Sequence, residues 1–216
     1  MTNVNENIDR IINSDHHDPF QVLGLHFIQE DSRVAQVRTF QPHAESVQII
    51  TGGKKQPMFK VREEGLFEIV LQEFSDPFPY EFEIKYHDGN SYTISDPYRF
   101  LPQLGDMDRY LFNSGTHYKL YDKLGAHRTH IENIEGTMFR VWAPSARRVS
   151  VVGNFNSWDG RVHQMRSLEK SGIWELFIPG IAEGELYKFE VRTQYRDLLV
   201  KADPFQFYGE IRPQTA

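Results

Sequence analysis

The stretch VRTFQPHAESVQII at residues 37–50 recurs 102 positions later as FRVWAPSARRVSVV at residues 139–152. Apolar and polar residues alternate in both copies, and this period of two is typical of half-buried β-strands. Pro42 and its counterpart Pro144 interrupt the alternation, so each copy predicts one strand that ends near the proline and a second strand that follows it. A repeat of this length indicates two copies of one structural unit.

The repeat continues beyond these strands with a changed offset. The offset becomes 107, which implies about five extra residues in the second copy, within a stretch that contains NFNSWDG at residues 154–160. An Asp-Pro pair closes each copy, because the residue before proline is pushed out of helical geometry. The matching segments are GLFEI at 65–69 with GIWEL at 172–176, YEFEIK at 80–85 with YKFEVR at 187–192, and DPYRF at 96–100 with DPFQF at 203–207.

Short strands without intervening helices predict an all-β chain of two consecutive immunoglobulin-like β-sandwiches, at residues 1–113 and 114–216. Charge supports two units, because the first stretch carries 10 Lys/Arg and 18 Asp/Glu and the second carries 14 and 12. Asp88-Gly89 is a hairpin signal. We expect a short helix near the N-terminus at residues 5–12, where three isoleucines share a face, and a second one around residues 114–124.

Composition excludes several classes of partner. The 216 residues carry a net charge of −6, which argues against nucleic acid or an anionic membrane as the main partner. With no cysteine, the chain has no disulfide framework and no thiolate chemistry. No apolar run approaches the ~20 residues of a membrane-spanning helix, and the polar start is unlike a signal peptide. We therefore expect a soluble, cytoplasmic protein.

No catalytic, cofactor or metal site is predicted. The phosphate-loop, dinucleotide and nucleophile-elbow motifs are absent from the sequence, and so are the zinc spacings. Acidic residues are plentiful, but nearly all fall at outward strand positions or in turns, so no catalytic pair can be chosen. The histidines that could suggest a metal are interpreted as surface or capping residues: His16, His17, His26, His127 and His130.

The tryptophans are more informative. Trp142 and Trp174 occupy repeat positions that are filled by Phe40 and Phe67 in the first copy, so we expect both in the core. Trp158 has no counterpart and lies in a polar, turn-forming loop. A tryptophan placed there either stacks on the apolar face of a sugar ring or folds back onto its own sandwich.

Five segments resemble the N-terminal region of bacterial glycogen branching enzymes, the 1,4-α-glucan branching enzymes of the α-amylase superfamily. The FNxWDG pattern alone would indicate only a carbohydrate-binding module of family 48. The opening DPFxVLGxH, combined with a preceding sandwich, is more specific. The segments are HDPFQVLGLH at 17–26, GTMFRVWAP at 136–144, VVGNFNSWDG at 151–160, GIWELFIPG at 172–180 and LYKFE at 186–190.

The resemblance implies a longer glycosyltransferase of glycogen biosynthesis, in which a (β/α)8 barrel transfers α-1,4-glucan segments to C6 hydroxyls. A barrel needs about 250 residues, and the two sandwiches fill the chain up to Ala216. The sequence therefore predicts a non-catalytic accessory region that is inactive alone. Its implied partners are α-1,4-glucan or glycogen and the catalytic barrel of the same enzyme.

The resemblance also implies binding residues. Trp158 matches the loop tryptophan that stacks on glucan in family 48 modules, and Lys188 matches the lysine that bonds sugar hydroxyls. Tyr195 falls where a second stacking aromatic is found, and Asn156 is a further candidate for hydroxyl contacts. Two alternatives stay open: a structural docking module without glucan affinity, and the matching region of a trehalohydrolase or an isoamylase. The opening motif favours a branching enzyme over the latter.

Overall fold

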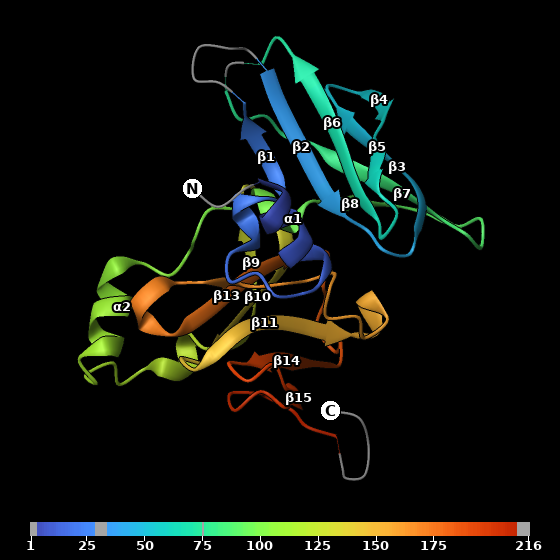
Figure 1. Ribbon diagram of the computed structural model, residues 1–216. Coiled ribbons are helices and arrows are strands. Elements are labelled where there is room, and N and C mark those ends of the chain that lie inside the picture. Colours follow the sequence, from blue (N-terminus) through green and yellow to red (C-terminus); the bar gives the residue numbers. More distant parts are fainter. Residues whose placement is uncertain (1–3, 29–33, 75, 211–216) are drawn as a thin grey trace. The chain divides into compact units, whose positions relative to one another are not determined.

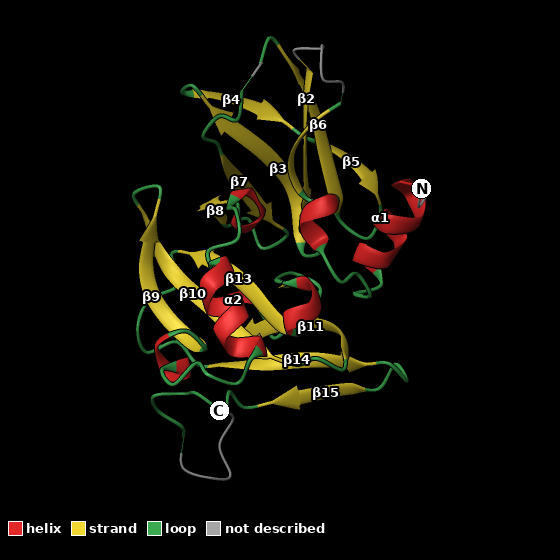
Figure 2. Cartoon of the chain, turned by 90° about the vertical axis from the view of Figure 1, so that its left-hand side faces the viewer, coloured by secondary structure: helices red, strands yellow, loops and turns green. Residues whose placement is uncertain are grey.

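Antiparallel strands of the first repeat copy form two four-stranded sheets (Figures 1 and 2). The computed structural model describes residues 4–28, 34–74 and 76–210. The first sheet, in spatial order, contains β1 (Gly24–Phe27), β2 (Val34–Phe40), β6 (Leu66–Gln72) and β5 (Phe59–Arg62). The second contains β4 (Lys54–Pro57), β3 (Ala44–Thr51), β7 (Glu81–Tyr86) and β8 (Ser91–Ser95).

The core of this first unit lies on the faces that the alternating pattern predicts. Val37 pairs with Ile69 across β2 and β6, and Ile49 pairs with Phe82 across β3 and β7. All four side chains are at most 6% exposed and belong to one apolar cluster. The period of two therefore sets which face of each strand is buried.

The second repeat copy forms a four-stranded and a three-stranded antiparallel sheet. Figure 1 shows β14 between β11 and β15 in the smaller sheet. The larger sheet, in spatial order, contains β12 (Arg166–Ser167), β13 (Ile173–Pro179), β10 (Ile134–Trp142) and β9 (Gly125–Ile131). The smaller contains β11 (Ala146–Gly153), β14 (Tyr187–Thr193) and β15 (Leu198–Lys201).

Each of these units is built as a two-sheet sandwich, so the predicted all-β fold class is confirmed. In the second unit the strands β11 and β13 are buried along nearly their whole length, on both faces. Alternate residues such as Val149 and Val151 pair with Val191 and Phe189 of β14. The intervening residues of β11 are covered by loops, and this cover shapes the candidate site.

The second unit contains a short segment from near the start of the sequence as well as the second repeat copy. It consists of Ser14–Pro19 and the residues from Phe100 onward, whereas the first unit contains Phe20–Arg99 and the residues before Ser14. This division differs from the predicted boundary after residue 113. The Phe100 ring packs edge-on against Phe177 at 4.8 Å, and the backbone N–H of Leu104 donates to Glu175 at 3.0 Å. These contacts hold the connecting segment on the second unit.

The N-terminal helix is confirmed and the second predicted helix is displaced. The first, α1, covers Val4–Ile12 and buries Ile8 and Ile11. Instead of a helix over residues 114–124, the structure has α2 (Asp106–Asn113) and a short 3-10 turn η3 (Leu120–Asp122). Acidic residues in the first turn of α2 favour this earlier start. No helix within the described ranges is long and apolar enough to cross a membrane. The remaining 3-10 turns are η1 (Pro19–Gln21), η2 (Pro97–Arg99), η4 (Asn154–Asn156) and η5 (Glu169–Ser171).

The internal repeat extends to side-chain contacts. In each unit an arginine–glutamate pair bridges two neighbouring strands of one sheet, a tyrosine hydroxyl donates to the aspartate of the closing Asp-Pro, and a histidine bonds a nearby leucine carbonyl. The paired contacts are Arg38–Glu68 with Arg140–Glu175, Tyr80–Asp96 with Tyr187–Asp203, and His26–Leu23 with His127–Leu124.

Candidate carbohydrate-binding site

The loop that follows β11 is the principal difference between the two units. In the first unit the Gly52-Gly53 turn leads from β3 directly into β4. In the second, η4 and a longer turn intervene before the chain returns along β11. The Val151 N–H donates to His163 at 3.0 Å and the Met165 N–H donates to Val149 at 2.9 Å, so the returning chain covers the free edge of β11.

Asn156 holds this loop from within. Its side chain is only 6% exposed, and its Oδ1 accepts the backbone N–H of Gly153 at 3.0 Å. Its Nδ2 donates to the carbonyl of Val151 at 2.8 Å and to Nδ1 of His163 at 2.9 Å. The amide is therefore occupied inside the loop, and its place is that of a positioning residue rather than of a side chain that faces ligand.

Trp158 is presented by a left-handed turn. Ser157 and Trp158 have φ angles of 54° and 59°, a conformation that is uncommon for residues other than glycine. The backbone N–H of Trp158 donates to Gly153 at 2.9 Å, and its indole Nε1 donates to Oδ1 of Asn154 at 3.0 Å. The side chain is half-buried. The indole is thus fixed at its edge while part of the ring stays accessible.

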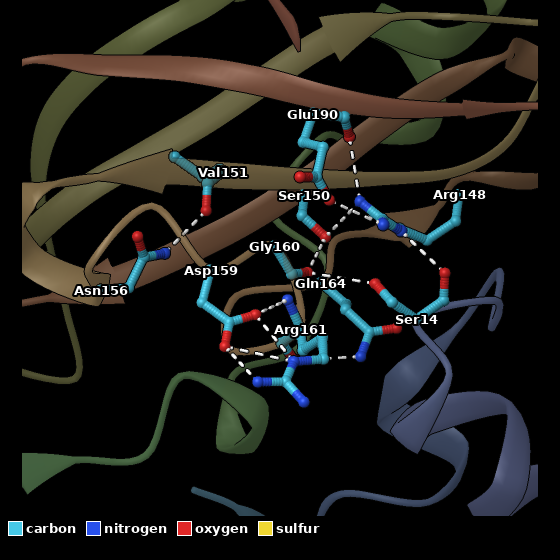
Figure 3. A network of polar contacts seen from close by, with 10 residues as sticks. All are labelled: Ser14, Arg148, Ser150, Val151, Asn156, Asp159, Gly160, Arg161, Gln164 and Glu190. Carbon is cyan, nitrogen blue, oxygen red and sulfur yellow. Dashed lines mark hydrogen bonds and ion pairs between the residues drawn. The ribbon is translucent and has the colours of Figure 1, made fainter. Parts of the chain in front are cut away.

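A buried polar network anchors the far end of the loop (Figure 3). Arg148 of β11 is 1% exposed, and its guanidinium donates to Glu190 of β14 at 2.8 Å, to Ser150 at 3.0 Å and to the carbonyl of Ser14 at 3.0 Å. Burial lowers the pKa of this guanidinium, although the neighbouring carboxylate opposes the effect. The hydroxyls of Ser14 and Ser150 both donate to the carbonyl of Gly160.

Asp159 and Arg161 close the loop next to this network. The carboxylate of Asp159 accepts the backbone N–H of Arg161 at 2.9 Å and forms an ion pair with its guanidinium at 2.7 Å (Figure 3). Gln164 donates in turn to the carbonyl of Arg161 at 3.0 Å. The WDG turn is therefore held by side chains on both sides of Trp158.

Lys188 lies beside the loop, and Tyr195 lies at the other end of the same strand. Lys188 pairs with Val152 across β11 and β14, one residue before the end of β11, and its half-buried side chain alternates with the buried Phe189. Tyr195 is 90% exposed in the turn between β14 and β15. At ~3.3 Å per strand residue, the five steps from Lys188 to Thr193 span about 17 Å. The strand pairing thus places Lys188 near the start of the loop that carries Trp158, and it sets Tyr195 apart.

Several histidines have structural partners. His26 and His127 each bond the carbonyl of a leucine three residues earlier, and the rings of His16 and His17 stack at 5.3 Å. Burial lowers the pKa of His163 to about 4, which keeps its ring neutral and its Nδ1 free to accept from Asn156. Among the described residues, no three His, Asp or Glu side chains gather as a metal site would need.

The comparisons with known proteins agree with this architecture. The family model described as "alpha-1,4-glucan branching enzyme GlgB, N-terminal domain" matches residues 4–98, and the model for "Carbohydrate-binding module 48 (Isoamylase N-terminal domain)" matches residues 123–206. The 1,4-alpha-glucan branching enzyme GlgB of Thermosynechococcus vestitus is 46% identical over 222 residues, which cover all of this chain and 28% of that protein. Those of Protochlamydia amoebophila and Myxococcus xanthus are each 41% identical, over 98% and 99% of the chain.

The chain belongs to the N-terminal region of the 1,4-alpha-glucan branching enzyme family.

The chain spans less than a third of the branching enzymes that it matches. Within it, the branching-enzyme model corresponds to the first sandwich and the carbohydrate-binding model to the second. A solved pullulanase from Anoxybacillus sp. LM18-11, complexed with maltotetraose, matches 84% of this chain and 24% of its own at 17% identity. The TM-score of this match is 0.33.

Sequence reasoning about this branching-enzyme region missed two features of the site. Trp142 is 55% exposed rather than in the core, because it lies at the end of β10 on the outer side of its sheet, where the Phe112 ring contacts it at 5.9 Å. Trp174 is buried as predicted, at 3%. The anchoring role of Arg148 was also missed. An Arg-Arg pair on a strand is typical of a solvated face, and the segment that covers it comes from far away in the sequence.

Proposed function

We propose that this chain is the glucan-contacting accessory region of a glycogen branching enzyme, and that Trp158 and Lys188 of the second unit bind an α-1,4-glucan. The parent enzyme, in this proposal, transfers α-1,4-glucan segments to C6 hydroxyls through a separate catalytic barrel, and the present chain is inactive alone. Membership of the second unit in a carbohydrate-binding module family supports the ligand class.

The observation that carries the proposal is the placement of Trp158. Its ring is partly accessible, its edge is fixed by Asn154, and its loop joins β11 one residue after the partner of Lys188. A fixed aromatic face loses little conformational freedom when it stacks on a ligand. The lysine ammonium supplies three donors for sugar hydroxyls beside it. Tyr195 is proposed as a more distant contact, and Asn156 as the residue that holds the loop.

Affinity electrophoresis in gels that contain glycogen tests this assignment. We expect the parent chain to be retarded, Trp158→Ala to lose the retardation and Lys188→Ala to reduce it. By analogy with base stacking, one aromatic contributes about 1–3 kcal/mol, or roughly 5- to 150-fold in Kd. Trp142→Ala is the matched control, because it removes a tryptophan that is more exposed and lies on the other sheet.

The rival function is a docking module without glucan affinity, and exposed apolar residues favour it. Met107 and Tyr110 of α2 are 69% and 68% exposed, and Tyr118 and Tyr121 follow at 89% and 56%. Exposed apolar side chains in such numbers are typical of contact surfaces. If no variant of the chain is retarded and Trp158→Ala melts far below the parent, Trp158 is a packing residue and the docking function replaces ours.

A further inference from the structure

A cavity of about 660 Å³ opens in the second unit, away from the outward face that carries Lys188. It lies between β9 and β10 on one side and the segments 181–187 and 206–208 on the other. The start of β14 forms one wall. Tyr187 faces the cavity there, while the next residue, Lys188, points to the opposite face of the strand. A volume of this size falls within the range of small-molecule sites, ~300–1,000 Å³.

The walls of the cavity are aromatic and are fixed by other contacts. Tyr187 meets Phe139 edge-on at 4.9 Å, and its hydroxyl donates to Asp203. The ring of Phe207 meets the edge of His127 at 5.6 Å, and that histidine is itself held by a leucine carbonyl. Because these rings already have partners, little side-chain ordering remains to be done when a ligand enters.

The mouth of the cavity combines exposed rings with polar groups. Phe207 and Tyr208 are 79% and 77% exposed, and the adjoining loop carries the exposed carboxylates Glu183 and Glu185. Arg128 also lines the cavity, but it forms an ion pair with Glu135. The mouth is therefore acidic, and it disfavours anionic ligands such as phosphates while offering acceptors to a neutral polyol.

We propose that this cavity is a second carbohydrate-binding site, in which Phe207 and Tyr208 stack on a glucosyl unit and Glu183 and Glu185 accept bonds from its hydroxyls. The choice of an α-1,4-glucan as the ligand rests on the function proposed above, whereas the site itself rests on the cavity and its rings. A neutral saccharide is the occupant that uses both the apolar rings and the carboxylates.

The two proposed sites adjoin each other through the backbone. A β-carbon on Gly153, at the base of the Trp158 loop, would lie 2.5 Å from the carbonyl oxygen of Leu186, which lines the cavity. The side chains of Tyr187 and Lys188 leave opposite faces of β14, so each site is expected to bind its own glucan segment.

Calorimetric titration of the 216-residue chain with maltotriose tests the second site. We expect two binding sites per chain in the parent, one in the double variant Phe207→Ala/Tyr208→Ala, and one in Trp158→Ala. Loss of an aromatic should weaken its own site at least fivefold. Phe59→Ala is the matched control, because Phe59 is 72% exposed on β5 of the first unit and should leave both sites intact.

The outcomes separate this proposal from the previous one. A single site that Trp158→Ala abolishes and the double variant leaves unchanged overturns the cavity site alone. A single site that only the double variant abolishes supports the cavity and overturns the role of Trp158. Absence of any heat of binding overturns both. Sedimentation that shows a parent dimer becoming monomeric in the double variant, without saccharide binding, would assign the cavity to a second copy of the chain and overturn the proposal.

Discussion

The Oε1 atom of Glu190 lies so close to Gly160 that a β-carbon on this glycine would be only 1.9 Å from that oxygen. Gly160 follows Trp158 by two residues, and Glu190 follows Lys188 by two residues on the same outward face of β14. The absence of a side chain at one position therefore lets the tryptophan loop settle against the strand that carries the lysine.

Gly160→Ala should destabilise the second unit and weaken glucan binding together. The methyl group must displace Glu190 from Arg148 or lift the loop, and such overpacking costs about 1–3 kcal/mol. Differential scanning calorimetry and glycogen affinity gels would measure the two effects. Gly105→Ala is the control, because its Cβ would meet nothing within 4 Å and its φ is −67°, so only a mild loss of helix capping is expected.

Arg148→Met should be among the most destabilising single changes in the second unit. It leaves the carboxylate of Glu190 beside buried polar groups without its guanidinium, and breaking a buried pair costs about 3–5 kcal/mol. The exposed pair Lys55–Glu83 supplies the control, and Lys55→Met should cost under about 1 kcal/mol. Urea unfolding curves would measure both. Recovery of stability in Arg148→Met/Glu190→Gln would show that the orphaned charge causes the loss, whereas no loss in Arg148→Met would contradict the anchoring role.

Asp96 should make the first unit less stable as pH rises from about 4 to about 6. Burial raises the pKa of this carboxyl to about 6, although the hydroxyl of Tyr80 and the N–H of Tyr98 donate to it. The folded state then holds a proton that the unfolded state releases, so the free energy of unfolding falls across this window. Asp96→Asn should remove that dependence in melting curves recorded between pH 4 and pH 7.

The pKa of Asp88 is shifted in the opposite direction to that of Asp96, so its effect on stability has the opposite dependence on pH. Backbone and side-chain N–H groups of Asn90 lower the pKa of this exposed carboxyl, so its small contribution is present at neutral pH and is lost as pH falls. Asp88→Asn should therefore leave the Asp96 window unchanged. A parent chain whose melting temperature rises between pH 4 and pH 6 by the same amount as that of Asp96→Asn would count against a protonated Asp96.

The tryptophan loop should loosen on acidification. The pKa of His163 is lowered to about 4 by burial, so the folded state binds fewer protons than the unfolded state between about pH 6.5 and pH 4, and stability falls as pH falls through that window. Protonation also removes the Nδ1 acceptor of Asn156. In the parent, the protection of the Trp158 backbone N–H against hydrogen exchange, measured relative to its intrinsic rate at each pH, should fall in acid. The effect should be weaker in His163→Gln, whose carbonyl cannot be protonated; equal behaviour of the two would sink this account.

The repeat predicts most of the fold because its signals are local. Strand positions, buried faces and the closing Asp-Pro turns depend on neighbours within a few residues, as Val37 and Ile69 illustrate. The prediction of a helix at 114–124 was wrong, because the helix of this region is α2, which lies between the glycines at 105 and 115. Trp142 failed for another reason. Its repeat partner Phe40 is 1% exposed, whereas Trp142 is 55% exposed. Two residues at the same position of the repeat therefore differ in how far neighbouring segments cover them.

The candidate site was less accessible to sequence reasoning. Trp158 and Lys188 could be chosen by residue type and motif, and the ladder between β11 and β14 brings their surroundings together. The burial of Arg148 could not be predicted, since Ser14 reaches it from 134 residues away. The cavity is formed by segments that are far apart in the sequence, and no pattern in them predicts that they enclose a space.

The segment Ser14–Pro19 has a consequence for how such modules can be inherited. The carbonyls of Ser14 and His17 accept hydrogen bonds from Arg148 and from the N–H of Ser167. Asp15 forms an ion pair with Arg147, which lies 132 residues later in the chain. A gene fragment that begins after the first sandwich would therefore encode the second one without six of its own residues. Recombination could move the two sandwiches between proteins as one cassette more easily than it could exchange the second alone.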